Sequence, residues 1–186
     1  MRQPFIALLL LAMASLVVSA QWHVDGQPVG DDTSRKVKDG FGAFLVVVPR
    51  PDLALERLLA PLPESGNGIP VADRVEPGVK YGALVLLGGC GRDAEGACLT
   101  QVDFTVYGPD GMLYCERVGE PAPAQAPSEA HETQVSQAIL PLVFEDTDQP
   151  GTYRVVAHVR DLTRNLSLDL ETSVILEPTQ SGRRPN

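Results

Sequence analysis

The sequence predicts an all-β protein, an antiparallel β-sandwich with one short helix near its start. Two observations support this prediction. Several short segments alternate apolar and polar residues with a period of two, as strands with one buried face do. Glycine- and proline-rich turns separate these segments. Two half-apolar sheets bury their apolar faces against each other, so we expect the strands in two packed layers.

The first twenty residues have the pattern of a secretory signal peptide. Arg2 precedes an apolar run over residues 5–18, and the small residues Ser19 and Ala20 follow it. The run is shorter than a comfortable membrane span, although an uncleaved anchor is the alternative. Cleavage after Ala20 makes Gln21 the mature start. We therefore expect a secreted protein, in the bacterial periplasm, with no transmembrane span after processing.

The charge balance excludes nucleic acid as an expected partner. The chain carries 15 Lys and Arg against 24 Asp and Glu, a net charge of −9. An acidic surface repels a phosphate backbone. Only three of the basic residues are lysines, and this bias toward arginine, with the many alanines, glycines and prolines, is typical of GC-rich bacterial genomes.

The sequence places one sandwich domain at residues 40–178. Residues 21–39 are polar, rich in glycine and aspartate and without a period, so we interpret them as a flexible lead-in. Residues 179–186 are expected to form a disordered tail. Within the domain, the apolar, β-branched run Phe41–Val48 ends at a proline and predicts the first strand.

One short helix is expected over about 52–60. Leucines recur at helical spacing after Asp52, which is a suitable residue for a helix start. The prolines and glycines that follow predict a loop, which ends at the turn Glu76–Gly78.

The middle of the chain predicts three strands. Tyr81–Leu87 is apolar on both faces, which is typical of a central strand. Gln101–Tyr107 alternates cleanly and directs Phe104 inward with its apolar neighbours. A proline–glycine turn then leads into a partner strand over Met112–Val118. A proline- and alanine-rich insertion, about 120–132, is expected as an exposed loop.

Three further strands are predicted after the insertion. Ser136–Phe144 alternates, and Pro141 within it indicates an edge strand or a bulge. Tyr153–Val159 and Leu166–Leu176 alternate as well.

The turn before Tyr153 resembles the corner before the sixth strand of immunoglobulin-like domains. It reads Asp-Gln-Pro-Gly-Thr-Tyr over 148–153, and an alternating strand follows it. In such domains a tyrosine hydroxyl returns to the backbone upstream, and the resemblance implies this role for Tyr153.

The resemblance covers roughly residues 78–177 and departs from true immunoglobulin domains at two points. Val155 occupies the place of the second core cysteine, and the lone Trp22 lies outside the sandwich. The resemblance therefore implies an immunoglobulin-like architecture, similar to the sandwich modules of bacterial secreted proteins. It implies no activity, because sites and not folds carry function.

Three cysteines, Cys90, Cys98 and Cys115, follow the signal segment. In an oxidising compartment two of them should pair. Cys90 and Cys98 bracket a short loop, so we expect a disulfide between them, with Cys98–Cys115 as the alternative. The absence of a Cys-x-x-Cys motif argues against a redox role.

Cys115 is expected on the inward face of its strand. If the turn pairs Tyr107 with Met112, Cys115 lies opposite Phe104. There a free thiol packs as a small apolar group.

The mature N-terminus is the sharpest metal-binding candidate. Its residues Gln21-Trp22-His23 combine a free amine with a histidine in third position, and such a terminus can wrap Cu(II) or Ni(II) in a square plane. His23 is the candidate metal ligand. An N-terminal glutamine tends to cyclise, however, and cyclisation removes the amine. Copper or nickel binding is therefore the alternative function, and no resident cofactor is expected.

The acidic residues near 31–32 and 145–148 match no calcium-binding loop, so we interpret them as solvated turns. A hydrolase needs a nucleophile beside a base. The three histidines, His23, His131 and His158, lie apart in the sequence, and no serine or cysteine occupies a nucleophile motif. A hydrolytic enzyme remains a third hypothesis.

The sequence favours a non-catalytic secreted module over these alternatives. We expect it to contact a protein partner through an exposed sheet edge, through loops or through the helix near residues 52–60.

Overall fold

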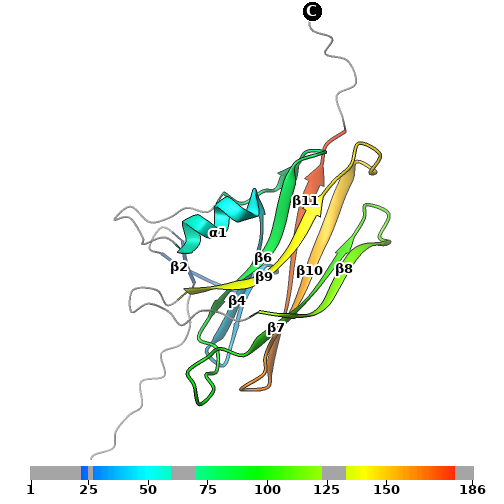
Figure 1. Cartoon of the computed structure of the whole chain (residues 1–186). Helices are drawn as coiled ribbons and strands as arrows, with labels where there is room; N and C mark the ends of the chain where they lie inside the picture. Colours follow the sequence, from blue (N-terminus) through cyan, green and yellow to red (C-terminus); the bar gives the residue numbers. More distant parts are fainter. Residues whose placement is uncertain (1–21, 25–26, 60–69, 123–132, 179–186) are drawn as a thin grey trace, which may run out of the picture.

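A computed structural model describes residues 22–24, 27–59, 70–122 and 133–178 and arranges them as a β-sandwich with one helix (Figure 1). A four-stranded and a five-stranded sheet pack together, and a two-stranded hairpin lies beside them. The predicted all-β sandwich is confirmed. The expected signal peptide, residues 123–132 of the insertion and the expected tail lie outside the described residues.

The four-stranded sheet is antiparallel, and its strands follow the order β3-β4-β6-β9. These strands are β3 (Arg35–Lys38), β4 (Phe41–Pro49), β6 (Lys80–Gly88) and β9 (Thr133–Val143). The two central strands, β4 and β6, are buried on both faces. The central position predicted for Tyr81–Leu87 is thereby confirmed.

The five-stranded sheet follows the order β5-β11-β10-β7-β8. Its strands are β5 (Arg74–Val75), β7 (Thr100–Tyr107), β8 (Leu113–Pro121), β10 (Gly151–Asp161) and β11 (Leu166–Leu176). All neighbours are antiparallel except β5, which adds to β11 in parallel. Along β7 buried and half-buried residues alternate, with Phe104 fully buried as expected.

Aromatic side chains fill one end of the core between the sheets. Phe144 and Tyr153 are fully buried, with ring centroids 4.8 Å apart, and Tyr114 lies 5.1 Å from Tyr153. The Tyr153 hydroxyl donates a hydrogen bond to the Gln149 carbonyl over 3.0 Å. This bond matches the role expected for Tyr153, and it satisfies the only polar group of a buried ring.

Helix α1 (Pro51–Leu59) lies within one residue of the predicted range. It packs on the outer face of the four-stranded sheet, where Ala54 contacts a second apolar cluster that includes Val48 and Leu84. Gly82 allows the close approach, because a Cβ at this position would lie 2.7 Å from Cβ of Pro51. In the part of the chain that the structure covers, no helix has the length and apolarity to cross a membrane.

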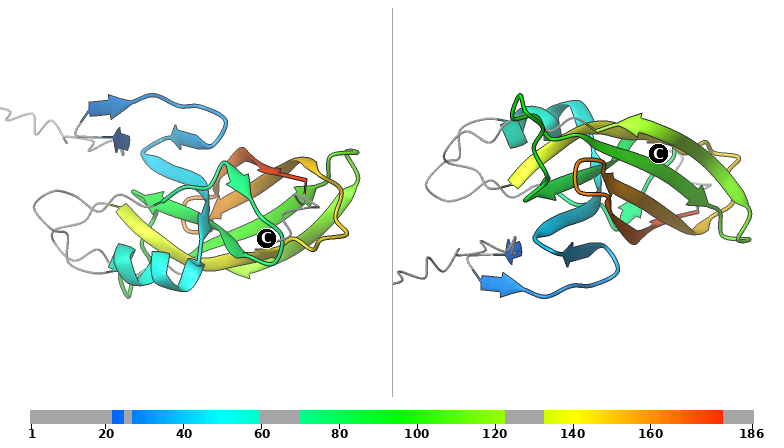
Figure 2. Two further views of the ribbon diagram at one scale, coloured as in Figure 1. Left: turned by 90° about the horizontal axis from the view of Figure 1, so that it is seen from above. Right: turned by 90° about the horizontal axis from the view of Figure 1, so that it is seen from below.

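Residues 21–39, expected as a flexible lead-in, contain three short strands. β1 (Trp22–Val24) pairs with β2 (Gln27–Val29), and β3 pairs with β4. The indole of Trp22 packs over Gly42 and Phe44 on the same outer sheet face as α1. Figure 2 shows these N-terminal strands (blue) well apart from the helix (cyan). Short edge strands of this kind are held by backbone pairing and need no apolar alternation.

The end of this segment also reaches the other sheet. The Glu171 backbone N–H donates to the Thr33 carbonyl over 2.7 Å, and the Lys36 ammonium group donates to the Asp169 carbonyl over 2.6 Å. Residues 33–36 therefore close the sandwich along the side formed by β3 and β11.

The pairing predicted for β8 was wrong in register. Tyr107 pairs with Leu113, because a bulge lies between the Val106 and Tyr107 positions. Cys115 consequently lies opposite Val106 and not opposite Phe104. This change preserves the face, so Cys115 remains a half-buried free thiol against the core. Burial raises the pKa of the Cys115 thiol, which keeps it protonated and unreactive.

Both long edge strands carry features that hinder pairing with another strand. β8 has a second bulge beside Gly119, whose φ is 73° and whose N–H donates to the Asp103 carboxylate over 2.6 Å. β9 carries a register shift opposite Val85 and contains Pro141, so the edge or bulge predicted from this proline is confirmed. Bulges and prolines are common means of protecting sheet edges from aggregation.

Candidate functional site

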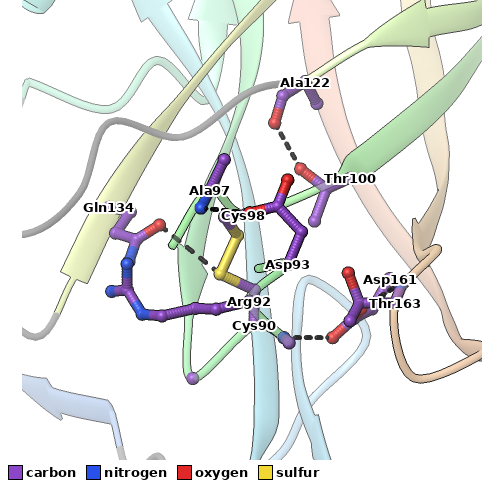
Figure 3. Close-up of a disulfide and its surroundings, with 12 residues drawn as sticks. Cys90, Arg92, Asp93, Ala97, Cys98, Thr100, Ala122, Gln134, Asp161 and Thr163 are labelled. Carbon is purple, nitrogen blue, oxygen red and sulfur yellow. Dashed lines mark hydrogen bonds between the residues drawn. A yellow bond between two sulfur atoms is a disulfide. The ribbon is translucent and has the colours of Figure 1, made fainter. Parts of the chain in front are cut away.

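The loop after β6 is closed by the predicted disulfide. Cys90 and Cys98 are bonded, with Cα atoms 5.8 Å apart (Figure 3). Inside the loop, the Asp93 carboxylate accepts hydrogen bonds from the Glu95 N–H over 3.1 Å and the Ala97 N–H over 2.7 Å. A disulfide that closes so short a loop stabilises the fold by roughly 2–3 kcal/mol. The loop is therefore held both covalently and by its own hydrogen bonds.

Asp161, the last residue of β10, fixes this loop to the neighbouring turn. Its carboxylate is 1% exposed and accepts hydrogen bonds from the backbone N–H groups of Gly91 (2.6 Å), Thr163 (3.1 Å) and Arg164 (3.1 Å). Burial alone raises the pKa of Asp161, but these hydrogen bonds and the Arg164 guanidinium outweigh it and lower the pKa below its usual value. Asp161 is thus a buried anion whose charge is fully compensated.

Arg164 extends this connection to a third turn. Its Nε donates to the Asp161 carboxylate over 2.9 Å, and its terminal nitrogens donate to the carbonyls of Gly89 and Asp39, the latter over 3.2 Å. The β3–β4, β6–β7 and β10–β11 connections are therefore joined around one ion pair. We call residues 38–41, 89–99 and 161–165 the stapled end.

The stapled end presents two apolar side chains to solvent. Leu99 is 46% exposed and Leu162 is 55% exposed. Their backbones are adjacent, because the Leu162 N–H donates to the Leu99 carbonyl over 2.9 Å. Apolar groups on a rigid frame are suited to recognition, since binding buries apolar area and orders few additional torsions.

The histidines do not form a site in the described part of the chain. His131 and Gln21 lie outside it, as does the side chain of His23, so the proposed metal-binding terminus is not described. His158 faces outward from β10, and its Nδ1 lies 2.6 Å from the Asp169 carboxylate on β11. His158 is thus a member of a cross-strand pair on the sheet surface.

The acidic turns bind their own backbone. The Asp148 carboxylate accepts from the Glu145 N–H and from the Tyr114 hydroxyl, each over 2.8 Å. Asp32 accepts from the Ser34 N–H over 2.8 Å. Across the described ranges, no group of three or more His, Cys, Asp or Glu side chains is placed to hold a metal ion.

Sequence reasoning identified the disulfide but missed Asp161 and Arg164. Their signal lay in the turn 161–165, where an aspartate precedes residues whose N–H groups it can bind two and three positions later. That pattern indicates a turn but does not show that the carboxylate also reaches Gly91, which is 70 residues away in the sequence.

In comparisons with known proteins, no family model matches the chain and no curated protein shows significant similarity to it.

Proposed function

We propose that this chain is a non-catalytic secreted module that binds a protein partner, and that the stapled end is its binding surface. The observation that carries the proposal is the exposed pair Leu99 and Leu162 on a frame held by a disulfide and a buried ion pair. A frame of this kind reduces the entropy lost on binding. Exposed aliphatic side chains supply the area to be buried.

The edges of β8 and β9 and the helix α1 are less suited to binding a protein partner. The bulges of β8 and Pro141 of β9 interrupt the backbone groups that strand addition needs. The buried face of α1 is already in contact with the sheet through Ala54 and Leu58. Loops on a rigid scaffold are a common location of binding residues.

The strand order supports an immunoglobulin-like architecture for the module. Among the seven strands β4, β6, β7, β8, β9, β10 and β11, the third, sixth and seventh share one sheet, and the first, second and fifth share the other. Immunoglobulin domains divide these six strands in the same way. The fourth strand, β8, departs from the constant-type pattern, because it joins the sheet of the third, sixth and seventh strands. The hydrogen bond from Tyr153 to Gln149 at the start of the sixth of these strands also supports this assignment.

A location in the periplasm accords with the disulfide, because such bonds persist in oxidising compartments. The apolar segment at residues 5–18 supplies the export signal in this proposal.

The proposal is tested with paired surface variants of the mature protein. A photo-crosslinking amino acid is placed at Thr163, beside the apolar pair, and the captured partner is identified in cells that secrete the chain. Affinity for that partner is then measured for Leu99→Glu/Leu162→Glu. Because hot-spot residues at the centre of an interface contribute 2 kcal/mol or more, we expect binding about 30-fold weaker or worse.

The matched control is Met112→Glu/Leu113→Glu at the opposite end of β7, where both side chains are also exposed. This control should bind the partner as the native chain does. Circular dichroism should show that both variants remain folded. The proposal is wrong if the first variant retains the partner or if the control loses it.

A further inference from the structure

A small pocket lies where β4 ends and α1 begins. It is lined by Pro49, Arg50, Leu53, Ala54, Arg57 and Pro70. β4 starts at the stapled end, and a strand rises about 3.3 Å per residue, so the pocket lies roughly 25 Å from the surface proposed above. It is a separate site.

The pocket combines apolar walls with positive charge in a chain whose net charge is −9. On α1, Leu53, Ala54 and Arg57 are three and four positions apart and share one side of the helix. The acidic residues Asp52 and Glu56 are not among the residues that line the pocket. The charged side chains that line the pocket, Arg50 and Arg57, are both cationic, and this suits an anionic group.

Arg50 holds a backbone conformation that its residue type disfavours. Its φ is +48°, and it precedes Pro51, which restricts it further. The position is fixed on both sides. The Arg50 carbonyl accepts from the N–H groups of Leu53 (3.0 Å) and Ala54 (3.1 Å), and its own N–H donates to the Lys80 carbonyl over 2.9 Å.

The strain at Arg50 points to a use for its side chain. Among the described residues, the other non-glycine residues with positive φ are Asp39 and Asn165, and both types tolerate this region in turns. A glycine at position 50 would adopt it without a Cβ clash. Residues held in such conformations cluster where a side chain binds a ligand.

We propose that this pocket binds a carboxylate carried on a short apolar group. The guanidinium of Arg50 pairs with the carboxylate, for which its planar fork of donors is well matched. Pro49, Leu53 and Pro70 contact the apolar part. The C-terminal residue of an apolar peptide and a free branched-chain acid share this chemistry.

The ligand class is tested by NMR titration of the mature protein with three probes. They are acetyl-Gly-Ala-Leu with a free carboxylate, the same peptide as its C-terminal amide, and 4-methylpentanoate. We expect the free-carboxylate peptide to shift the Leu53 methyl and Arg50 side-chain resonances saturably, with an affinity about tenfold or more above that of the amide. Equal binding of 4-methylpentanoate identifies a small acid as the ligand, and weaker binding identifies a peptide terminus. Equal binding of peptide and amide, or no saturable shift with either acid, overturns the proposal.

Variants separate binding from folding. Arg50→Gly should lose the carboxylate response while its melting temperature stays unchanged or rises, because glycine relieves the positive φ. Arg50→Lys keeps the charge without the fork and should bind with intermediate affinity. Asn165→Gly is the matched control, since it relieves a φ of 52° away from the pocket and should bind normally. Native affinity in Arg50→Gly, or loss of affinity in Asn165→Gly, would contradict the proposal.

Discussion

The outer faces of the two sheets differ in what they contact. The outer face of the four-stranded sheet is apolar, and it is covered by α1 at one corner and by Trp22 at another. Among the described residues, nothing comparable covers the outer face of the five-stranded sheet, which carries charged side chains. Strand β10 shows its pattern, because Arg154, His158 and Arg160 all project from it.

Each of these three β10 side chains faces an acid on a neighbouring strand. Arg154 lies 3.0 Å from Glu171, His158 lies 2.6 Å from Asp169, and Arg160 lies 2.7 Å from Asp103. The Arg154 guanidinium also lies 4.3 Å from the centre of the Tyr107 ring. The pairs of Arg154 and His158 remain in contact with water and contribute little net stability, whereas the pair of Arg160 with Asp103 is partly buried.

The difference shows that the sandwich has two apolar interfaces and not one. A second set of aliphatic residues, on the far side of β4 and β6, depends on the helix and on the N-terminal strands for its burial. Outside the pocket at the end of β4, a partner surface is therefore not expected on this face, since most of its apolar area is already buried within the chain.

The largest effect is expected from truncating a leucine under the helix. Leu84 points out of the sandwich but is fully buried, as Leu45 is inside it. Leu84→Ala and Leu45→Ala should each lower the free energy of unfolding by about 2–5 kcal/mol. Urea denaturation measures both. If Leu84→Ala alone lowered the free energy of unfolding by less than about 1 kcal/mol, burial under α1 would contribute little to stability. The proposed difference between the two outer faces would then be wrong.

Alanine substitutions at three glycines test how tightly α1 and Trp22 pack on the outer face of the four-stranded sheet. A Cβ at Gly82 would lie 2.7 Å from Pro51, one at Gly42 would lie 3.3 Å from the Trp22 ring, and one at Gly30 would have no neighbour within 4 Å. Gly82→Ala should therefore lower the free energy of unfolding by about 1–3 kcal/mol.

Gly42→Ala is expected to have a smaller effect, since the Trp22 ring needs to shift by only a few tenths of an ångström. Gly30→Ala should change the free energy of unfolding by less than about 0.5 kcal/mol in either direction. Thermal melts rank the three variants. A different rank order would show that the covers over Gly82 and Gly42 are not tightly packed.

The smallest effect is expected on the open face. A double-mutant cycle of Arg154→Gln and Glu171→Gln should give a coupling of about 0.2–1 kcal/mol, because both side chains are nearly half exposed. One molar salt should remove most of this coupling. A coupling that persists in high salt would indicate that the face is shielded from solvent, contrary to its open appearance.

The sequence was sufficient to predict a strand and its buried face where the other face of that strand meets water. The alternation around Phe104 identified β7 and its inward face directly, since a period of two needs one wet and one dry side. The pair Cys90–Cys98 was predictable because the intervening chain is short. The continuous apolar run Tyr81–Leu87 indicated burial on both faces but not the identity of its covers.

The remaining features depend on contacts between distant residues or on backbone irregularities. Because of the bulge beside Tyr107, Cys115 pairs with a residue of β7 two positions from the one expected. The local sequence does not indicate this bulge. The strand Arg35–Lys38 has no apolar alternation, so only its backbone pairing with β4 reveals it. In the candidate site, Asp161 meets Gly91 only after β6, β7 and β10 have assembled.

The contact between residues 33–36 and β11 has a consequence for how the chain matures. The hydrogen bond from Lys36 to Asp169 spans 133 positions. The β3–β4 pair therefore gains this contact only after β11 has been synthesised. Contacts of such long range slow folding, because the intervening chain must first be ordered. In the export proposed above, the chain would thus remain incompletely folded until β11 had crossed the membrane.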